Sequence, residues 1–159
     1  MWPVLTRIWF VLSDCALKQD DHEQAISYEQ KILHELPQDQ LPPPNHQTQL
    51  NMRVLSRRTE RADIELAQEL LDHMKNAEDG DKLAAVLDMM QADIFFQDGQ
   101  YQAAARGYQT LISKGALNNA EQQQYIHMKL DKCKEQLGDS EFQFIVDDIE
   151  QQSQQATVH

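Results

Sequence analysis

The chain has 159 residues, with 14 Lys and Arg against 26 Asp and Glu, which gives a formal net charge of −12 at pH 7. A surface this acidic repels phosphate backbones and anionic lipid headgroups, so the charge argues against nucleic-acid partners. The composition, 41% hydrophobic and 25% charged, is that of a globular protein, and five glycines and five prolines leave little turn material for an all-β fold. We therefore predict an all-α fold.

The chain begins with an apolar stretch that does not match a signal peptide, because no cationic region precedes it and Arg7 interrupts it. No stretch approaches the roughly 20 apolar residues of a membrane span, so we expect no membrane insertion. Cys15 and Cys133 belong to no C-x-x-C pair or metal-ligand set, and we predict that both are reduced and buried. This favours the cytoplasm; the periplasm, or a place within a larger protein, stays open.

Apolar residues at three- to four-residue spacing predict eight helices. The first covers about 4–18. Asp20 and Glu23 form a predicted capping box for the second helix, which runs to about Leu36 and ends at Pro37.

A proline-rich loop follows over residues 37–46, and we expect it to be non-helical, with an extended spacer at 42–44. The pattern from 47 to 77 is helical throughout. No Gly or Pro marks a turn there, whereas repeat spacing argues for a break near Thr59–Asp63, so one helix or two remains open.

The second half of the chain has clearer boundaries. Gly80 and Asp81 predict a helix end and the cap of a fifth helix over about 82–97, and Gly99 turns the chain into a sixth over about 101–114.

Two further helices complete the prediction. Asn118 or Asn119 begins the seventh, and Gly138 separates it from an eighth that Ser140 caps. Residues 151–159 are rich in Gln and Ser, and we predict a disordered tail.

Small residues recur at one interval. Ser13 and Ala25 are twelve residues apart, and so are Ala92 and Ala104. This interval fits two antiparallel helices that cross so closely that only small side chains fit between them.

With the residues around these pairs, the chain resembles the tetratricopeptide repeat (TPR). The resemblance rests on Trp9-x-x-Leu12-Ser13 with Ala25 and Pro37, and on the stretch from Ala92 to Tyr108. It implies a right-handed α-solenoid of about four antiparallel helix hairpins in a single domain over 1–150. The residues it assigns to repeat packing are Trp9, Leu12, Ser13, Ala25, Pro37, Ala92, Gly99, Tyr101, Ala104 and Tyr108.

Two predicted hairpins depart from the repeat pattern. Leu55 stands where the second hairpin should carry a small residue, and Asp131 stands there in the last hairpin. The last hairpin is therefore predicted to be a divergent cap whose outer face is exposed to solvent.

The resemblance also implies a concave groove, built by the first helix of each hairpin. Methionines and aromatic residues there would suit an apolar or amphipathic segment of a partner. The alternative, that these side chains complete the core, stays open. The predicted groove residues are Phe10, Asp14, Leu17, Met52, Met89, Asp93, Phe96, Tyr125, Met128 and Lys132.

The chain carries no phosphate-loop, dinucleotide, zinc-protease or nucleophile-elbow motif, so we predict no catalytic residue, no metal and no cofactor. Those members of the repeat family that grip C-terminal carboxylates use Lys, Asn and Arg on the inner face. Phe10, Met52, Asp14 and Asp93 occupy those places here, so this clamp is not expected.

The expected function is that of a bacterial-type, non-catalytic TPR-like scaffold that binds another protein or peptide in its groove. Two alternatives remain: a chaperone of type III secretion translocators, and a regulatory or sensory domain of a longer signalling enzyme. A homodimer also stays open. The acidic surface favours a basic or apolar partner.

Overall fold

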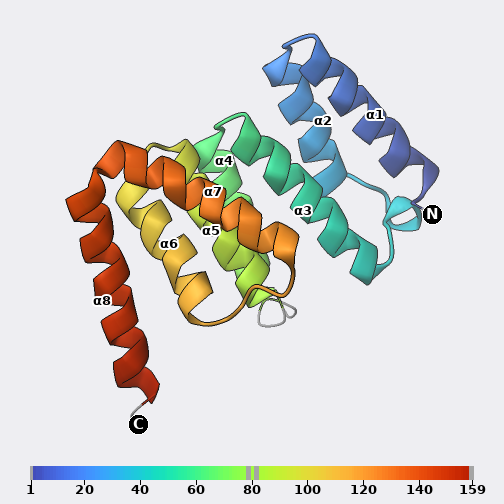
Figure 1. The fold of residues 1–159 in the computed structure, drawn as a ribbon. Coiled ribbons are helices and arrows are strands. Elements are labelled where there is room, and N and C mark those ends of the chain that lie inside the picture. Colours follow the sequence, from blue (N-terminus) through green and yellow to red (C-terminus); the bar gives the residue numbers. More distant parts are fainter. Residues whose placement is uncertain (1, 78–79, 81–82, 158–159) are drawn as a thin grey trace. The chain divides into compact units, whose positions relative to one another are not determined.

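The computed structural model describes residues 2–77, 80 and 83–157 (Figure 1). In these described residues the fold is all-helical: they form eight α-helices, 81% of these residues are helical, and no strand occurs among them. Within the same residues, no helix combines the length and the apolarity needed to cross a bilayer. The all-α prediction is therefore confirmed.

The chain divides into two compact units, Met1–Val54 and Leu55–His159, where the sequence predicted one domain over 1–150. The boundary falls inside α3. The helices are α1 (Val4–Lys18), α2 (His22–His34), α3 (Pro44–Glu60), α4 (Ile64–Lys75), α5 (Ala84–Gln97), α6 (Tyr101–Ser113), α7 (Ala120–Leu137) and α8 (Asp139–Thr157), with a short 3-10 turn, η1 (Gln38–Gln40), after α2.

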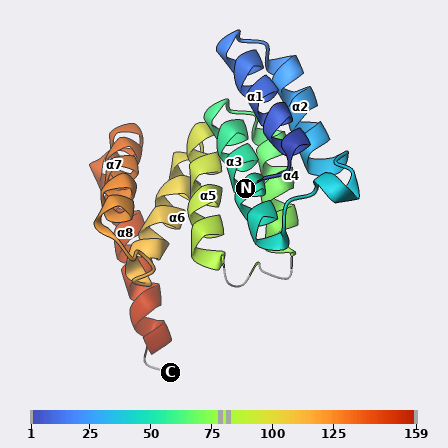
Figure 2. The ribbon, with the colours of Figure 1, turned by 90° about the vertical axis from the view of Figure 1, so that its right-hand side faces the viewer.

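The first unit is built on α1 and α2, which pack along each other (Figure 2). Their buried face consists of Thr6, Phe10, Ser13, Ala16, Ala25, Glu29 and Ile32. Gln40 of η1 returns to the start of α1: its Oε1 accepts a hydrogen bond from the Leu5 amide (3.0 Å), and its carbonyl accepts one from the Thr6 hydroxyl (2.9 Å). One of the amides that a helix start leaves without an intrahelical partner is thereby satisfied.

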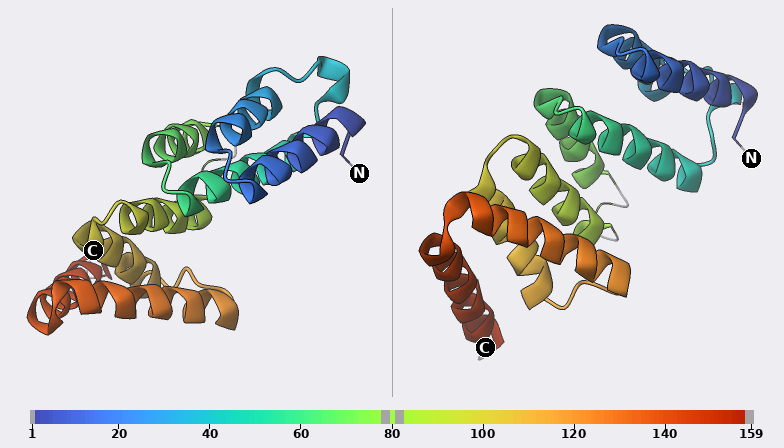
Figure 3. Two further views of the ribbon diagram at one scale, coloured as in Figure 1. Left: turned by 90° about the horizontal axis from the view of Figure 1, so that it is seen from above. Right: turned by 45° about the horizontal axis from the view of Figure 1, so that its top comes forward.

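In the second unit α5 packs on α4 and α6, and α6 also packs on α7 and α8. Helices α7 and α8 diverge from the connection between them (Figure 3). Gln68 of α4 and Gln91 of α5 exchange two amide hydrogen bonds of 2.8 Å, and Arg106 of α6 pairs with Asp148 of α8 at 2.8 Å. The core consists of Ala92, Ala104, Ala105, Tyr108, Leu111, Ile126, Leu130, Cys133, Ile145 and Ile149.

Three hairpins have the same type of turn. The turns of α1–α2, α3–α4 and α5–α6 each contain a residue with left-handed backbone: Asp20 (φ 57°), Ala62 (φ 60°) and Gly99 (φ 77°). In each, the amide of the next residue bonds at 2.9 Å to the carbonyl five residues earlier, which is the Schellman arrangement. Five residues after the left-handed position lies a fully buried alanine in every case: Ala25, Ala67 and Ala104.

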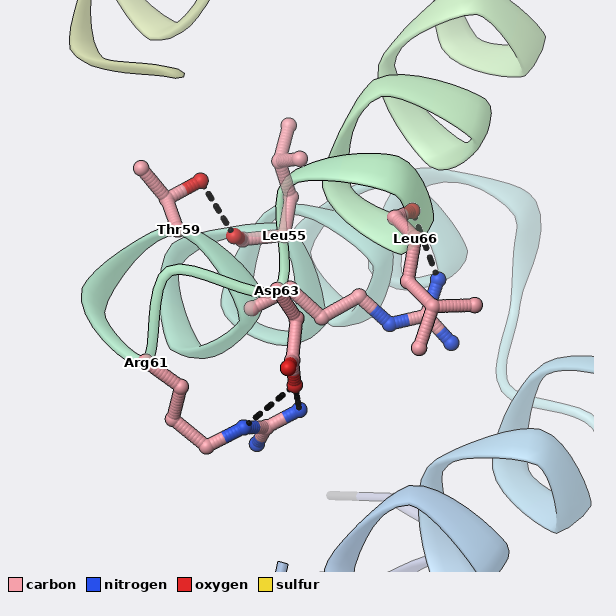
Figure 4. Close-up of polar contacts among 6 residues, drawn as sticks. Leu55, Thr59, Arg61, Asp63 and Leu66 are labelled. Carbon is pink, nitrogen blue, oxygen red and sulfur yellow. Dashed lines mark hydrogen bonds and ion pairs between the residues drawn. The ribbon is translucent and has the colours of Figure 1, made fainter. Parts of the chain in front are cut away.

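The segment 47–77 therefore contains two helices, with a break over Arg61–Asp63. Figure 4 shows this turn, where the Thr59 hydroxyl donates to the Leu55 carbonyl (2.9 Å) and Arg61 pairs with Asp63 (2.9 Å). The sequence left the break undecided because Ala62 occupies a backbone region that usually calls for glycine.

The prediction that 37–46 is non-helical holds only for Pro37 and residues 41–43. Residues 38–40 form η1, and Pro44 is the first residue of α3. Proline is well suited to a first helical position, since the amide it lacks would have no intrahelical acceptor there.

Two predicted caps are also wrong. Asp21, not Asp20, caps α2 and accepts a hydrogen bond from the Gln24 amide (3.1 Å), because Asp20 occupies the left-handed position before it. Ser140 lies inside α8, which begins directly after Gly138. The predicted cap Asp81 lies outside the described residues.

The predicted tail is largely helical, because α8 continues to Thr157 instead of ending near 150. No glycine or proline interrupts residues 151–157, and glutamine and alanine favour helices. Residues 158 and 159 lie outside the described part.

Helices α5 and α6 cross at an unusually close contact. A Cβ placed on Gly107 of α6 would lie 2.9 Å from the Cβ of Ala92 on α5. Real Cβ atoms do not approach so closely, and neither side chain can rotate away. Gly107 is therefore the direct partner of Ala92 at this crossing, beside the predicted Ala104.

Substitutions at two of the left-handed positions should change the stability of the protein in opposite directions. Ala62→Gly should raise the free energy of unfolding by about 0.5–1 kcal/mol, because relief of about 1–2 kcal/mol of backbone strain exceeds the entropy added to the unfolded chain. Gly99→Ala should lower it by a similar amount, since its Cβ meets nothing within 4 Å and only the backbone penalty acts. Urea unfolding measures both, and equal signs would contradict the shared turn.

Gly107→Ala should destabilise the protein, because overpacking costs about 1–3 kcal/mol while the gain in helix propensity is only about 1 kcal/mol. In an Ala92→Gly background the clash is gone, so the same substitution should become stabilising. A double-mutant cycle by urea unfolding tests this contact, and additive effects would exclude it.

Candidate functional site

A pocket of about 290 Å³ opens in the second unit on the side formed by α5, α7 and the last turn of α3. Each of these three helices is the first helix of a hairpin, as the predicted groove requires. Its lining residues are Ser56, Thr59 and Glu60 of α3, Met90, Asp93 and Gln97 of α5, and Tyr125 and Lys129 of α7.

Asp93 is the structural centre of this pocket. One oxygen of its carboxylate, Oδ1, accepts hydrogen bonds from the hydroxyls of both Tyr108 on α6 and Tyr125 on α7, the latter at 2.9 Å. Tyr108 is fully buried, so its hydroxyl requires an acceptor inside the protein. The carboxylate thus joins three helices and also forms part of the pocket wall.

Burial raises the pKa of the Asp93 carboxyl, because it disfavours the charged form; the two tyrosine hydrogen bonds and the Lys129 charge oppose this in part. Burial, followed by the negative charge of Asp93, also raises the pKa of Tyr108 and of Tyr125. Both tyrosines therefore remain protonated donors at physiological pH.

Lys129 contributes a positive charge to the same wall. Its ammonium nitrogen lies 4.2 Å from the ring centroid of Phe96 and 5.6 Å from that of Tyr125, within the range of cation–π attraction. Together with Asp93 and the exposed Glu60, the pocket offers two carboxylates and one ammonium beside apolar surface from Met90 and Tyr125.

Of the ten predicted groove residues, Asp93 and Tyr125 line the pocket. Met89 and Phe96 instead pack half-buried against the core of the second unit. Met128 and Lys132 are exposed on α7 outside the pocket lining. The prediction missed the other six lining residues. Met90, Gln97 and Lys129 each directly follow a predicted residue, so the error there is one of register on the helix. The other three, Ser56, Thr59 and Glu60, lie in the last turn of α3, beyond the predicted Met52.

The remaining four predicted groove residues belong to the first unit. Phe10 is buried there, with the Trp2 ring 5.3 Å away between centroids, so its prediction as a groove residue is wrong: it completes a core. Asp14 is exposed, and Leu17 and Met52 are half-buried.

Of the predicted packing residues, Ser13, Ala25, Ala92, Ala104 and Tyr108 are buried. Trp9 and Tyr101 are half-buried, and the Lys31 ammonium lies 5.9 Å from the Trp9 ring centroid. Leu12, Pro37 and Gly99 are exposed and do not pack in a core. Leu12 is 37% exposed on α1, Pro37 follows the end of α2, and Gly99 serves its turn through its backbone.

The two cysteines differ, although both are free thiols. Cys133 is fully buried, and burial raises its pKa to about 11, so the reactive thiolate is disfavoured. Cys15 is exposed, which corrects the prediction that both are buried.

The pocket can provide hydrogen bonds, charge and apolar contact to a ligand. Within residues 2–77, 80 and 83–157, no group of three or more His, Cys, Asp or Glu side chains is placed to hold a metal ion. Comparison with protein-family models, with curated proteins and with solved structures found no match to the chain. The TPR resemblance therefore stays a prediction, and function has to be argued from the pocket itself.

The raised pKa of Asp93 predicts a pH-dependent stability. Between the ordinary value of 3.8 and the raised one, the folded protein binds more protons at this carboxyl than the unfolded chain. Its contribution to the free energy of unfolding therefore falls as pH rises through that window. Asp93→Asn removes the titration but keeps an acceptor oxygen, so the stability of the variant relative to the wild type should rise with pH.

Urea unfolding of both proteins from about pH 3.5 to pH 7 measures this difference. Asp131→Asn is the control, because it removes an exposed carboxylate from α7. A constant or falling difference for Asp93→Asn would show that the carboxylate is not penalised by its surroundings.

Proposed function

We propose that the protein is a non-catalytic, TPR-like scaffold that binds an amphipathic segment of another polypeptide at the pocket formed by α3, α5 and α7. The observation that carries this proposal is the pocket around Asp93, whose carboxylate two tyrosines hold in place. Such fixed polar groups beside apolar surface are typical of binding sites that orient a ligand.

The composition of the wall supports an amphipathic ligand over a purely apolar one. Met90 and Tyr125 offer adaptable and aromatic contact, while Glu60, Asp93 and Lys129 offer charged partners. An apolar side chain in the pocket would leave these charged groups without compensation as water is displaced. The basic residues of a segment that also carries apolar ones would pair with the carboxylates of Glu60 and Asp93, and such a segment would also be attracted by the net charge of −12.

The shared turn of three hairpins supports the repeat part of the proposal. Asp20, Ala62 and Gly99 precede fully buried alanines by the same five residues. Repetition of one supersecondary unit is what a solenoid requires, and we propose that these hairpins belong to a right-handed solenoid of the TPR type.

Peptide selection tests the proposed site. A random peptide library selected on the purified chain should yield amphipathic sequences with basic residues, and fluorescence anisotropy measures their affinities. Met90→Lys, which replaces apolar contact with a positive charge that repels basic residues, should weaken binding of the selected peptides roughly tenfold or more.

Met128→Lys is the matched control, because Met128 is 46% exposed on α7 and does not line the pocket. It should leave affinity unchanged. If both variants bind the selected peptides as the unchanged protein does, the binding site lies elsewhere.

A further inference from the structure

Helix α1 carries an apolar surface that the hairpin does not use. Val4, Ile8, Val11 and Leu12 are 57%, 46%, 59% and 37% exposed, and Cys15 is exposed as well. Their positions follow i, i+4, i+7, i+8 and i+11, so they lie on one face of the helix. We call these five residues the outer stripe.

The outer stripe lies opposite the face that already packs in the first unit. That inner face consists of Thr6, Phe10, Ser13 and Ala16, which are buried. A helix that is buried on one side and apolar on the opposite side is typical of one enclosed between partners. On a chain with a net charge of −12, a row of five exposed apolar side chains is typical of a surface that binds an apolar partner surface.

The charges beside the outer stripe indicate what that partner is. Arg7, Asp14 and Lys18 are exposed and spaced i, i+7 and i+11, so they share one edge of the stripe. The opposite edge carries Leu5 and Leu12. The stripe therefore has one charged edge, with both signs of charge, and one apolar edge.

We propose that the outer stripe is a homodimer interface, in which α1 packs antiparallel against α1 of a second copy about a two-fold axis. In such a pair, the residue numbers of two residues that face each other across the axis add up to nearly the same total along the whole contact. Val4 faces Cys15 (4 and 15 add up to 19), and Ile8 faces Val11 and Leu12 (totals of 19 and 20). Arg7 meets Asp14 at a sum of about 21, so the same axis that matches the apolar residues also pairs opposite charges twice.

The two different edges of the outer stripe favour an antiparallel over a parallel pair of helices. A two-fold axis across antiparallel helices brings the charged edge of one copy beside the charged edge of the other, where Arg7 faces Asp14. A parallel pair would place the charged edge against Leu5 and Leu12 of its partner, which would desolvate charges without compensation. The contact spans about 17 Å of helix, so the buried area lies at the low end for stable interfaces and the dimer should be reversible.

Sedimentation equilibrium of the full chain over a range of concentrations tests the dimer. We expect a reversible monomer–dimer equilibrium, and Val11→Glu should raise its dissociation constant roughly tenfold or more, because it places two carboxylates next to the axis. Phe144→Glu is the matched control: Phe144 is 66% exposed on α8, so an effect of general surface apolarity would appear there too. Circular dichroism confirms that each variant is folded.

A charge exchange tests the pairing of edges. Arg7→Asp and Asp14→Arg should each weaken the dimer, and the double variant should restore it, because opposite charges then meet again in the reverse order. A merely structural role of either residue would not give this restoration.

Disulfide formation tests the direction. Under mild oxidation Val4→Cys should form covalent dimers through Cys15 of the other copy, whereas the unchanged chain should form none, since its two Cys15 residues lie far from the axis. A chain that stays monomeric at every concentration, a dimer unaffected by Val11→Glu, or covalent dimers through Cys15 alone would overturn the proposal.

Discussion

The close crossing of paired helices is the constraint on which the rest of the structure depends. At three hairpins an alanine without exposed surface stands five residues after a left-handed turn. A larger side chain at any of these positions would hold the helices apart, and overpacking of this kind costs about 1–3 kcal/mol. The limit is sharpest between α5 and α6, where Gly107 meets Ala92 with no room for even one more methyl group.

This crossing also determines where the pocket can form. Because α5 and α6 lie so close, the Tyr108 hydroxyl of α6 reaches the carboxylate of Asp93, which directly follows Ala92 on α5. The same carboxylate receives the Tyr125 hydroxyl of α7. Core packing and pocket geometry are therefore coupled through one acidic side chain, and a change in the spacing of α5 and α6 would alter the shape of the pocket.

The sequence predicted the helices and their number because apolar periodicity is strong wherever one face is buried. It did not predict the start of α3 at Pro44, since a proline run resembles a loop whether or not a helix follows. It left the turn at Ala62 undecided because alanine gives no signal for left-handed backbone. The register that Ala92 sets predicts both Asp93 and Met89 as groove residues. Asp93 does line the pocket, but Met89 packs against the core, and Met90, about 100° further round the helix, lines the pocket instead.

The turn at Ala62 has a consequence for how the molecule fluctuates. Among the three shared turns it carries the residue least suited to left-handed backbone, at a cost of about 1–2 kcal/mol. It directly follows Thr59 and Glu60, which form the rim of the pocket. Local opening should therefore start at this rim sooner than in the other hairpins, and its amide hydrogens should exchange with solvent faster. A ligand bound against the rim would slow that exchange. Binding in the pocket would therefore change the hydrogen-exchange rates of the backbone amides in the neighbouring turn.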